Sequence, residues 1–221
     1  MTTRAKWLTG GMVAVAVALA GVPIAWVTAS NAARADVVVL TDARAFECVD
    51  TDDATSYAVS LDALDAVDAL DALDEITIEI PAVRLSDGLD CTYSFTLHNT
   101  GPTDVEISSI RLPFMGAQSG AGLRATMLDY QGLSPKHTGS VDAVFDLTTP
   151  TELNSGPAAL AAGEAHKFTV HLAFADGCVS DGGAVIVDEA PIAGITARGL
   201  GGTIVRPGPA YALVGTAESG C

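Results

Sequence analysis

Few residues of this chain have the types and spacing that chemistry would need. The histidines are His98, His137, His166 and His171. His166 and His171 are five residues apart in one expected strand, so they point to opposite faces of a sheet and cannot share a metal ion. The sequence contains no His-Glu-x-x-His, no Gly-x-Ser-x-Gly and no glycine-rich phosphate loop ending in Lys-Ser or Lys-Thr. We therefore nominate no catalytic residue, no metal ligand and no cofactor, and we do not expect an enzyme.

The stretch LDALDAVDALDALDE, residues 61–75, is the other candidate, because its aspartates could bind cations. An apolar residue, an aspartate and an alanine recur with a period of three. This period gives a strand no constant face, and it makes the apolar residues of a helix wind around the axis. The stretch also lacks the Asp-x-Asp-x-Asp-Gly spacing of an EF-hand loop. We expect an acidic spacer that leads into the folded domain, with dispersed calcium binding as the alternative.

The chain has four cysteines, and none of them forms a Cys-x-x-Cys pair. They are Cys48, Cys91, Cys178 and Cys221. An even number of cysteines in an exported chain predicts two structural disulfides. Four cysteines allow three pairings, and their spacing does not select one.

The first 35 residues have the order of an export signal. MTTRAKW is positively charged, residues 8–29 are uncharged and mostly apolar, and Ala33-Arg34-Ala35 offers the small-x-small pattern of a cleavage site. Trp7 and Trp26 bracket the apolar run, as tryptophans do at the two ends of a membrane helix. Residues 1–35 are therefore a cleaved signal peptide or a retained membrane anchor. In both cases we expect the chain from Asp36 onward to lie outside the cell.

The exported part is strongly acidic. Three of the 11 basic residues and none of the 27 acidic residues precede Asp36, so the remainder carries eight basic and 27 acidic residues, a formal charge of −19. Such a surface repels phosphates, which argues against nucleic acids and anionic lipid headgroups as partners.

From residue 76 onward, short runs of β-branched and aromatic residues alternate with polar ones and are separated by Gly, Pro, Asn and Asp. This pattern is typical of a sandwich of two antiparallel sheets. The runs are ITIEIPAVRL, CTYSFTLHN, VEISSIRLPF, VDAVFDL, HKFTVHLAF, GAVIVDE and GTIVRP.

Two of these runs carry a resemblance. CTYSFTLHNTGPTDVEISSIRLPF, residues 91–114, resembles the strand–turn–strand unit of bacterial immunoglobulin-like surface modules related to cell adhesion. LAAGEAHKFTVHLAF, residues 160–174, resembles the approach to a late strand of the same modules. The resemblance covers residues 76 to about 175 and implies an immunoglobulin-like β-sandwich with a surface location.

The resemblance also implies a disulfide pairing. In these modules the strand that begins at Cys91 lies antiparallel beside the strand of residues 166–174. Cys91–Cys178 is then the expected pair and leaves Cys48–Cys221. The sequential pairing, Cys48–Cys91 with Cys178–Cys221, stays open.

Together these features predict three parts. Residues 1–35 are a signal peptide or anchor, residues 36–75 an acidic spacer, and residues 76–221 an immunoglobulin-like sandwich. The expected function is that of a non-enzymatic interaction module of the cell surface or envelope, whose partner is a protein or another envelope component. The alternative is an exported protein that binds cations or small ligands through its Asp-rich segment.

Overall fold

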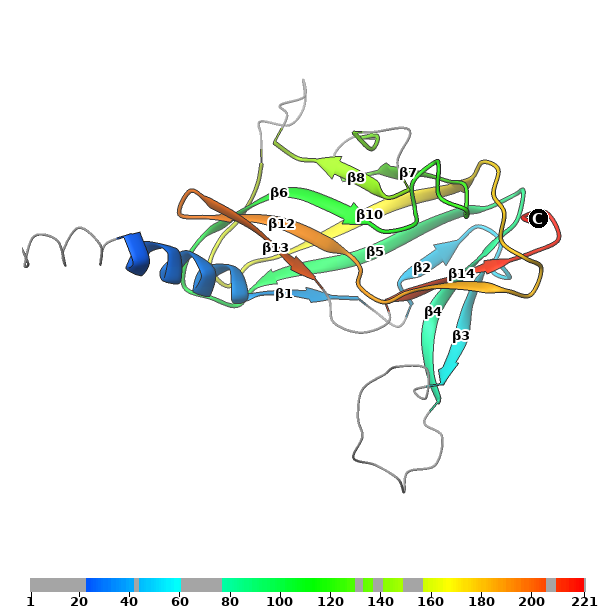
Figure 1. Cartoon of the computed structure of the whole chain (residues 1–221), viewed down its shortest axis with the longest axis horizontal. Coiled ribbons are helices and arrows are strands. Elements are labelled where there is room, and N and C mark those ends of the chain that lie inside the picture. Colours follow the sequence, from blue (N-terminus) through cyan, green and yellow to red (C-terminus); the bar gives the residue numbers. More distant parts are fainter. Residues whose placement is uncertain are drawn as a thin grey trace, which may run out of the picture.

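The computed structural model describes residues 23–41, 44–60, 77–129, 133–136, 141–148, 157–205 and 210–220. Within them the chain forms a helix over residues 23–35 and 14 strands (Figure 1). The strands are β1 (Val37–Leu40), β2 (Phe46–Cys48), β3 (Ala54–Ser60), β4 (Thr77–Leu85), β5 (Asp90–Asn99), β6 (Val105–Leu112), β7 (Leu123–Met127), β8 (Ala143–Asp146), β9 (Ala158–Leu160), β10 (Ala165–Phe174), β11 (Ala184–Val187), β12 (Ile192–Ala197), β13 (Leu200–Val205) and β14 (Tyr211–Gly215). No helix in this part of the chain is long and apolar enough to cross a membrane.

Two five-stranded antiparallel sheets carry the main core. The β5 sheet has the order β1-β5-β10-β7, with β2 also paired to β5. The β6 sheet has the order β13-β12-β6-β8, with β9 also paired to β6. In chain order the first sheet follows the A-B-E-D order of an immunoglobulin-type sandwich, and β6, β12 and β13 follow its C-F-G order. The protein is therefore all-β and immunoglobulin-like, with β8 and β9 added beside β6.

Alternating side chains of the strands fill the space between these sheets. Every second residue of β5 from Cys91 to Asn99 is buried, as the period of two predicts. The ring of Phe95 stacks on that of Phe168 in β10, with centroids 5.4 Å apart. The ring centroids of Tyr93 and Tyr211, which lies in β14, are also 5.4 Å apart. All four rings belong to one buried cluster that joins the sheets.

A third sheet extends the predicted two-sheet sandwich. This β4 sheet has the order β11-β14-β4-β3, and its strands β14 and β4 run parallel. On one of its faces Val83 and Leu85 belong to the main core. Its other face forms a small separate cluster with Val59 and Ile80 at its centre. Apolar residues on both faces of β4 explain why ITIEIPAVRL is more apolar than a strand with one solvated face.

The expected start of the domain at residue 76 is wrong, because β1, β2 and β3 precede it and are part of the fold. β1 and β2 pair with the two ends of β5, and β3 pairs with β4. These strands are three to seven residues long. Strands so short show little periodicity in the sequence, and their place is decided by the edges of β5 and β4 that they complete.

The period-three stretch, residues 61–75, lies outside the described residues. Its position in the chain is nevertheless informative, because β3 ends at Ser60, β4 begins at Thr77, and these two residues are directly paired. The stretch therefore connects the two strands of an antiparallel hairpin. The expectation that it leads into the domain is wrong.

The disulfide pairing implied by the resemblance, Cys91–Cys178, is also wrong. Cys91 is bonded to Cys48, which lies directly opposite it across the β2–β5 pair with a Cα–Cα distance of 4.0 Å. β10 does lie antiparallel beside β5 as expected, but its register places Leu172 opposite Cys91. Cys178 comes after β10 has ended, and it is disulfide-bonded as well. The remaining cysteine of the sequence, Cys221, lies outside the described residues.

Deletion of residues 61–73 is expected to change the melting temperature by no more than about 3 °C, equivalent to roughly 1 kcal/mol. The pairing of Ser60 with Thr77 fixes both ends of the connection. Asp74, Glu75 and Ile76 then remain as a three-residue hairpin loop, a common length whose closure costs less entropy than that of a longer one. Circular dichroism melting of both chains measures the difference.

The matched control replaces residues 61–73 by a Gly-Ser segment of the same length. Unfolding of both variants would show that the native segment packs against the β4 sheet. A rise in melting temperature with millimolar calcium in the intact chain alone would support the cation-binding alternative.

Candidate functional site

The structure separates the histidines. His98 lies on β5, His166 and His171 lie on β10, and His137 falls outside the described residues. His166 contacts the ring of Phe168, and the Nε2 atom of His171 lies 3.0 Å from a carboxylate oxygen of Asp90. No group of three or more His, Cys, Asp or Glu residues in the described segments is placed to hold a metal ion.

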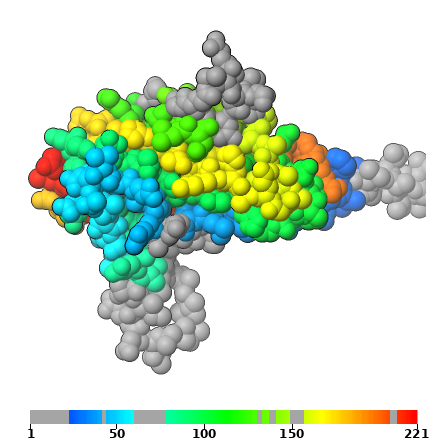
Figure 2. Space-filling view, turned by 180° about the vertical axis from the view of Figure 1, so that it is seen from behind, coloured from blue at the N-terminus to red at the C-terminus, as the bar shows by residue number. Residues whose placement is uncertain are grey.

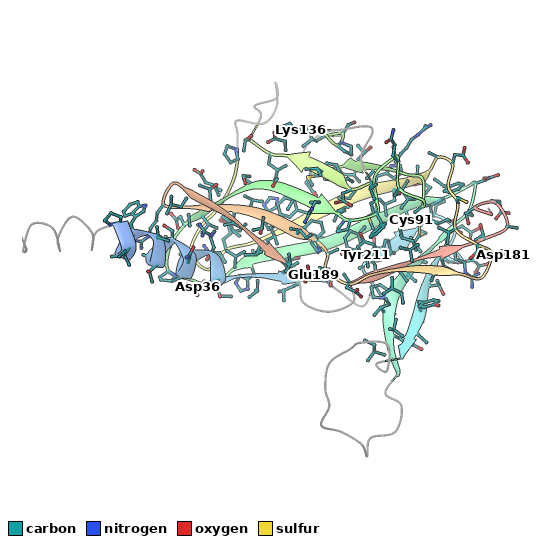
Figure 3. All side chains as sticks on the ribbon, viewed as in Figure 1. Asp36, Cys91, Lys136, Asp181, Glu189 and Tyr211 are labelled. Carbon is teal, nitrogen blue, oxygen red and sulfur yellow. A yellow bond between two sulfur atoms is a disulfide. The ribbon has the colours of Figure 1, made fainter. Side chains whose placement is uncertain are left out.

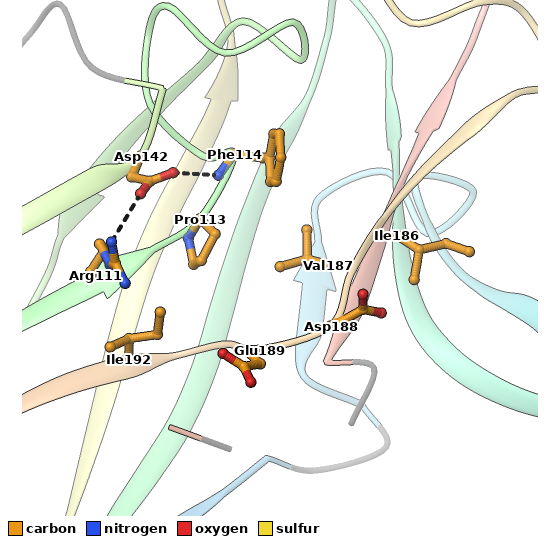
Figure 4. A pocket seen from close by; sticks show the side chains of 9 residues that line it. All are labelled: Arg111, Pro113, Phe114, Asp142, Ile186, Val187, Asp188, Glu189 and Ile192. Carbon is orange, nitrogen blue, oxygen red and sulfur yellow. Dashed lines mark hydrogen bonds and ion pairs between the residues drawn. The ribbon is translucent and has the colours of Figure 1, made fainter. Parts of the chain in front are cut away.

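An open groove lies where the β6 sheet meets the β4 sheet (Figure 4). One side comes from the end of β6, the residues that follow it, the residue before β8 and the start of β12. The other side comes from β11 and its connection to β12. The groove encloses about 480 Å³. Its lining residues are Arg111, Pro113, Phe114, Asp142, Ile186, Val187, Asp188, Glu189 and Ile192.

A tight turn after β6 places Phe114 on the rim of this groove. β6 ends at Leu112, and the next residue, Pro113, has no N–H group to continue the ladder. Phe114 has a φ of 59°, in the left-handed region that a bulky residue rarely occupies. Its N–H group donates to a carboxylate oxygen of Asp142 at 3.2 Å. The turn leaves the Phe114 side chain 42% exposed, although it is large and apolar.

Tyr211 supports the turn from inside the core (Figure 3). Its hydroxyl donates to the Pro113 carbonyl oxygen at 2.5 Å. Burial raises the pKa of Tyr211 well above its usual range, and the nearby Tyr93 and Asp142 raise it further. The hydroxyl therefore keeps its proton at physiological pH and continues to donate its hydrogen bond to the Pro113 carbonyl oxygen.

The charged residues of the groove are mainly acidic. Arg111 Nη1 lies 3.6 Å from Asp142 Oδ2, so these two side chains form an ion pair on one side. Asp188 and Glu189 are exposed on the connection that follows β11. The lining thus has a formal excess of two negative charges beside the exposed apolar side chains Phe114 and Ile186. This arrangement suits a ligand that is both basic and apolar.

Sequence reasoning missed this groove. For Leu-Pro-Phe at 112–114 and Val-Asp-Glu at 187–189 the sequence predicts only the ends of strands. They are about 75 positions apart, and no motif links them. The one local signal for the groove is the two consecutive acidic residues directly after an apolar strand, and this pattern recurs elsewhere in the acidic chain.

Comparisons with known proteins add little to the geometry. No protein-family model matches the chain, and no curated protein matches it. One similar solved structure is the ASH/PapD-like domain of human CEP192 (PapD-like domain 7), with 14% identity and a TM-score of 0.28, covering 61% of this chain and 79% of that one. Another is the Pseudomonas fluorescens alkylpurine DNA glycosylase AlkC bound to DNA containing an abasic site analog, with 14% identity and a TM-score of 0.25, covering 60% of this chain and 27% of that one. At such low TM-scores neither similarity carries an argument about function.

Proposed function

We propose that this protein is an exported, non-enzymatic interaction module of the cell surface or envelope, and that the groove between the β6 and β4 sheets is its binding surface. The observation that carries this proposal is the exposed Phe114 ring beside unneutralised carboxylates. Export is supported by the order of charged, apolar and small residues in positions 1–35 and by the Cys48–Cys91 disulfide, since disulfides persist in oxidising compartments.

The ligand class follows from the lining of the groove. A lysine or arginine side chain of a partner protein can pair with Asp188 and Glu189 and lie over the face of Phe114. Each such contact at an exposed site contributes about 0.5–1 kcal/mol, so several are needed for measurable affinity. Apolar side chains of the same segment can cover Ile186, which is exposed. The proposed partner is therefore a protein segment that is basic and apolar.

Combined substitution of Asp188→Asn and Glu189→Gln is expected to weaken binding of a peptide rich in lysine and leucine by about tenfold, since two contacts of this size are lost. Phe114→Ala should weaken the same binding by a smaller factor. Binding of the native chain should also fall as salt rises, because exposed charges are screened. Isothermal titration with the lysine–leucine peptide measures the effects of the substitutions and of salt. A glutamate–leucine peptide is the control for the charge of the ligand.

The matched control is Asp87→Asn with Asp181→Asn, which removes the same two charges from exposed positions elsewhere. Asp181 lies at the end of the domain far from Asp36, and Glu189 lies near the middle (Figure 3). Equal losses in the groove and control variants would mean that binding follows net charge alone, and the groove would not be the site.

A further inference from the structure

The end of the helix at residues 23–35 is packed into the domain, although the sequence marks it as a signal peptide or anchor. Ser30 is fully buried and Ala33 is 4% exposed. Ala33 belongs to the main hydrophobic cluster, together with residues of all three sheets. In the space-filling view the helix (blue) lies against the β12–β13 hairpin (orange) (Figure 2).

Arg34 covers β13, which is the last strand of the β6 sheet. Its Nη1 atom donates to the Leu200 carbonyl oxygen at 2.7 Å. The side chain also lies so close to Gly202 that a Cβ atom there would be 2.6 Å from Arg34 Nε. Covering an edge strand in this way protects it from pairing with another chain.

The peptide bond after Ala35 lies in an ordered junction. The N–H of Asp36 donates to the Ala32 carbonyl oxygen at 3.1 Å, and the Asp36 carbonyl oxygen accepts from the N–H of Thr100 at 2.9 Å. The Asp36 side chain packs on Gly101, where a Cβ atom would be 2.5 Å from Asp36 Oδ2. Ala35 is exposed and Asp36 is half-buried, but hydrogen bonds of Asp36 order the backbone here, and proteolysis concentrates at poorly ordered backbone.

The other end of the helix is apolar and exposed. Ile24, Trp26 and Val27 are 67%, 49% and 47% exposed, and they lie on different sides of the helix. A helix that is apolar all round suits lipid better than water. In the sequence it is part of the uncharged apolar run of residues 8–29. The Arg198 guanidinium carbon lies over the Trp26 ring, 6.0 Å from its centroid, and tryptophans are enriched at membrane–water interfaces.

We infer that residues 23–35 remain part of the folded protein after export, and that their exposed apolar end contacts the lipid bilayer with the β12–β13 hairpin beside it. This inference rests on the proposed export. The acidic remainder of the chain is repelled by anionic headgroups, so the helix is the part that holds the domain at the membrane. Ala33 and Arg34 of the small-x-small pattern then serve the packing of the junction.

Retention is tested on the full chain expressed in a bacterium. Mass spectrometry of the folded protein should find residues 23–35 present. Gly202→Val should displace Arg34 and accelerate trypsin cleavage after Arg34 about tenfold, because cleavage follows the population of the open junction. Gly201→Val is the matched control, since the nearest atom to a Cβ there is 4.0 Å away, and its cleavage rate should equal that of the native chain.

Lipid contact is tested with Trp7→Phe, which leaves Trp26 as the one tryptophan. In vesicles of brominated phosphatidylcholine its fluorescence should be quenched relative to unbrominated vesicles. A folded protein that begins at Asp36, equal cleavage rates in the two glycine variants, or unquenched fluorescence would each overturn the inference. None of these results depends on the groove, so loss of groove binding with a retained helix contradicts the proposed function alone.

Discussion

Replacing Phe95 by alanine is expected to lower the melting temperature by about 10 °C. Phe95 is 2% exposed, stacks on Phe168 and lies 5.7 Å from the ring of Tyr93. Truncating a buried phenylalanine costs roughly 3–5 kcal/mol, because the cavity it leaves closes only in part. In a domain of this size each kcal/mol corresponds to about 2–4 °C. Thermal melting by circular dichroism or calorimetry measures the shift.

Phe114→Ala is the matched control, because it removes the same ring from the exposed rim of the groove. Its melting temperature should stay within about 2 °C of the native value, since exposed substitutions usually change stability by less than 0.5 kcal/mol. Comparable losses for the two variants would contradict the assignment of Phe95 to the core and Phe114 to the surface.

Removing the Cys48–Cys91 disulfide is expected to lower the melting temperature by about 8 °C. The bond closes a loop with a sequence separation of 43 residues. Cross-links of this kind typically stabilise the folded state by about 2–4 kcal/mol, largely by restricting the unfolded chain. Cys48→Ala combined with Cys91→Ala breaks this bond alone, whereas a reducing agent would also act on the disulfide of Cys178.

Peptide mapping without reduction provides the check on this pairing. The native protein should yield a linked peptide that contains Cys48 and Cys91, and the double variant should keep the disulfide of Cys178. A linked peptide that joins Cys91 to Cys178 would mean that β2 does not complete the edge of β5. The double alanine variant would then leave two unpaired cysteines.

Several features of the fold could be predicted from local pattern. The alternation Tyr93, Phe95, Leu97 identified β5 and its buried face, and the same alternation identified β10. The short-strand composition led to an all-β sandwich, and the antiparallel pairing of β5 with β10 followed from the resemblance. These predictions succeed because the direction of a side chain in a strand is a property of the strand itself.

Other features could not be predicted from local pattern. β1 and β2 are too short to show a period, and β14 lies parallel to β4 although about 130 residues separate them. The pairing of Cys48 with Cys91 depends on which short strand completes the edge of β5. Which strands become neighbours depends on the total apolar surface that segments far apart in the sequence bury together. A short stretch of sequence does not contain this information.

The candidate groove shows the same division. Local pattern predicts that Phe114 follows a strand ending in Leu-Pro and that Asp188 and Glu189 follow an apolar run. That these residues line one groove, with the Tyr211 hydroxyl bonded to the Pro113 carbonyl oxygen, depends on the tertiary structure. The physical reason is that the β4 sheet packs against the sandwich through Tyr211 and its neighbours, and this long-range packing brings the two strand ends together.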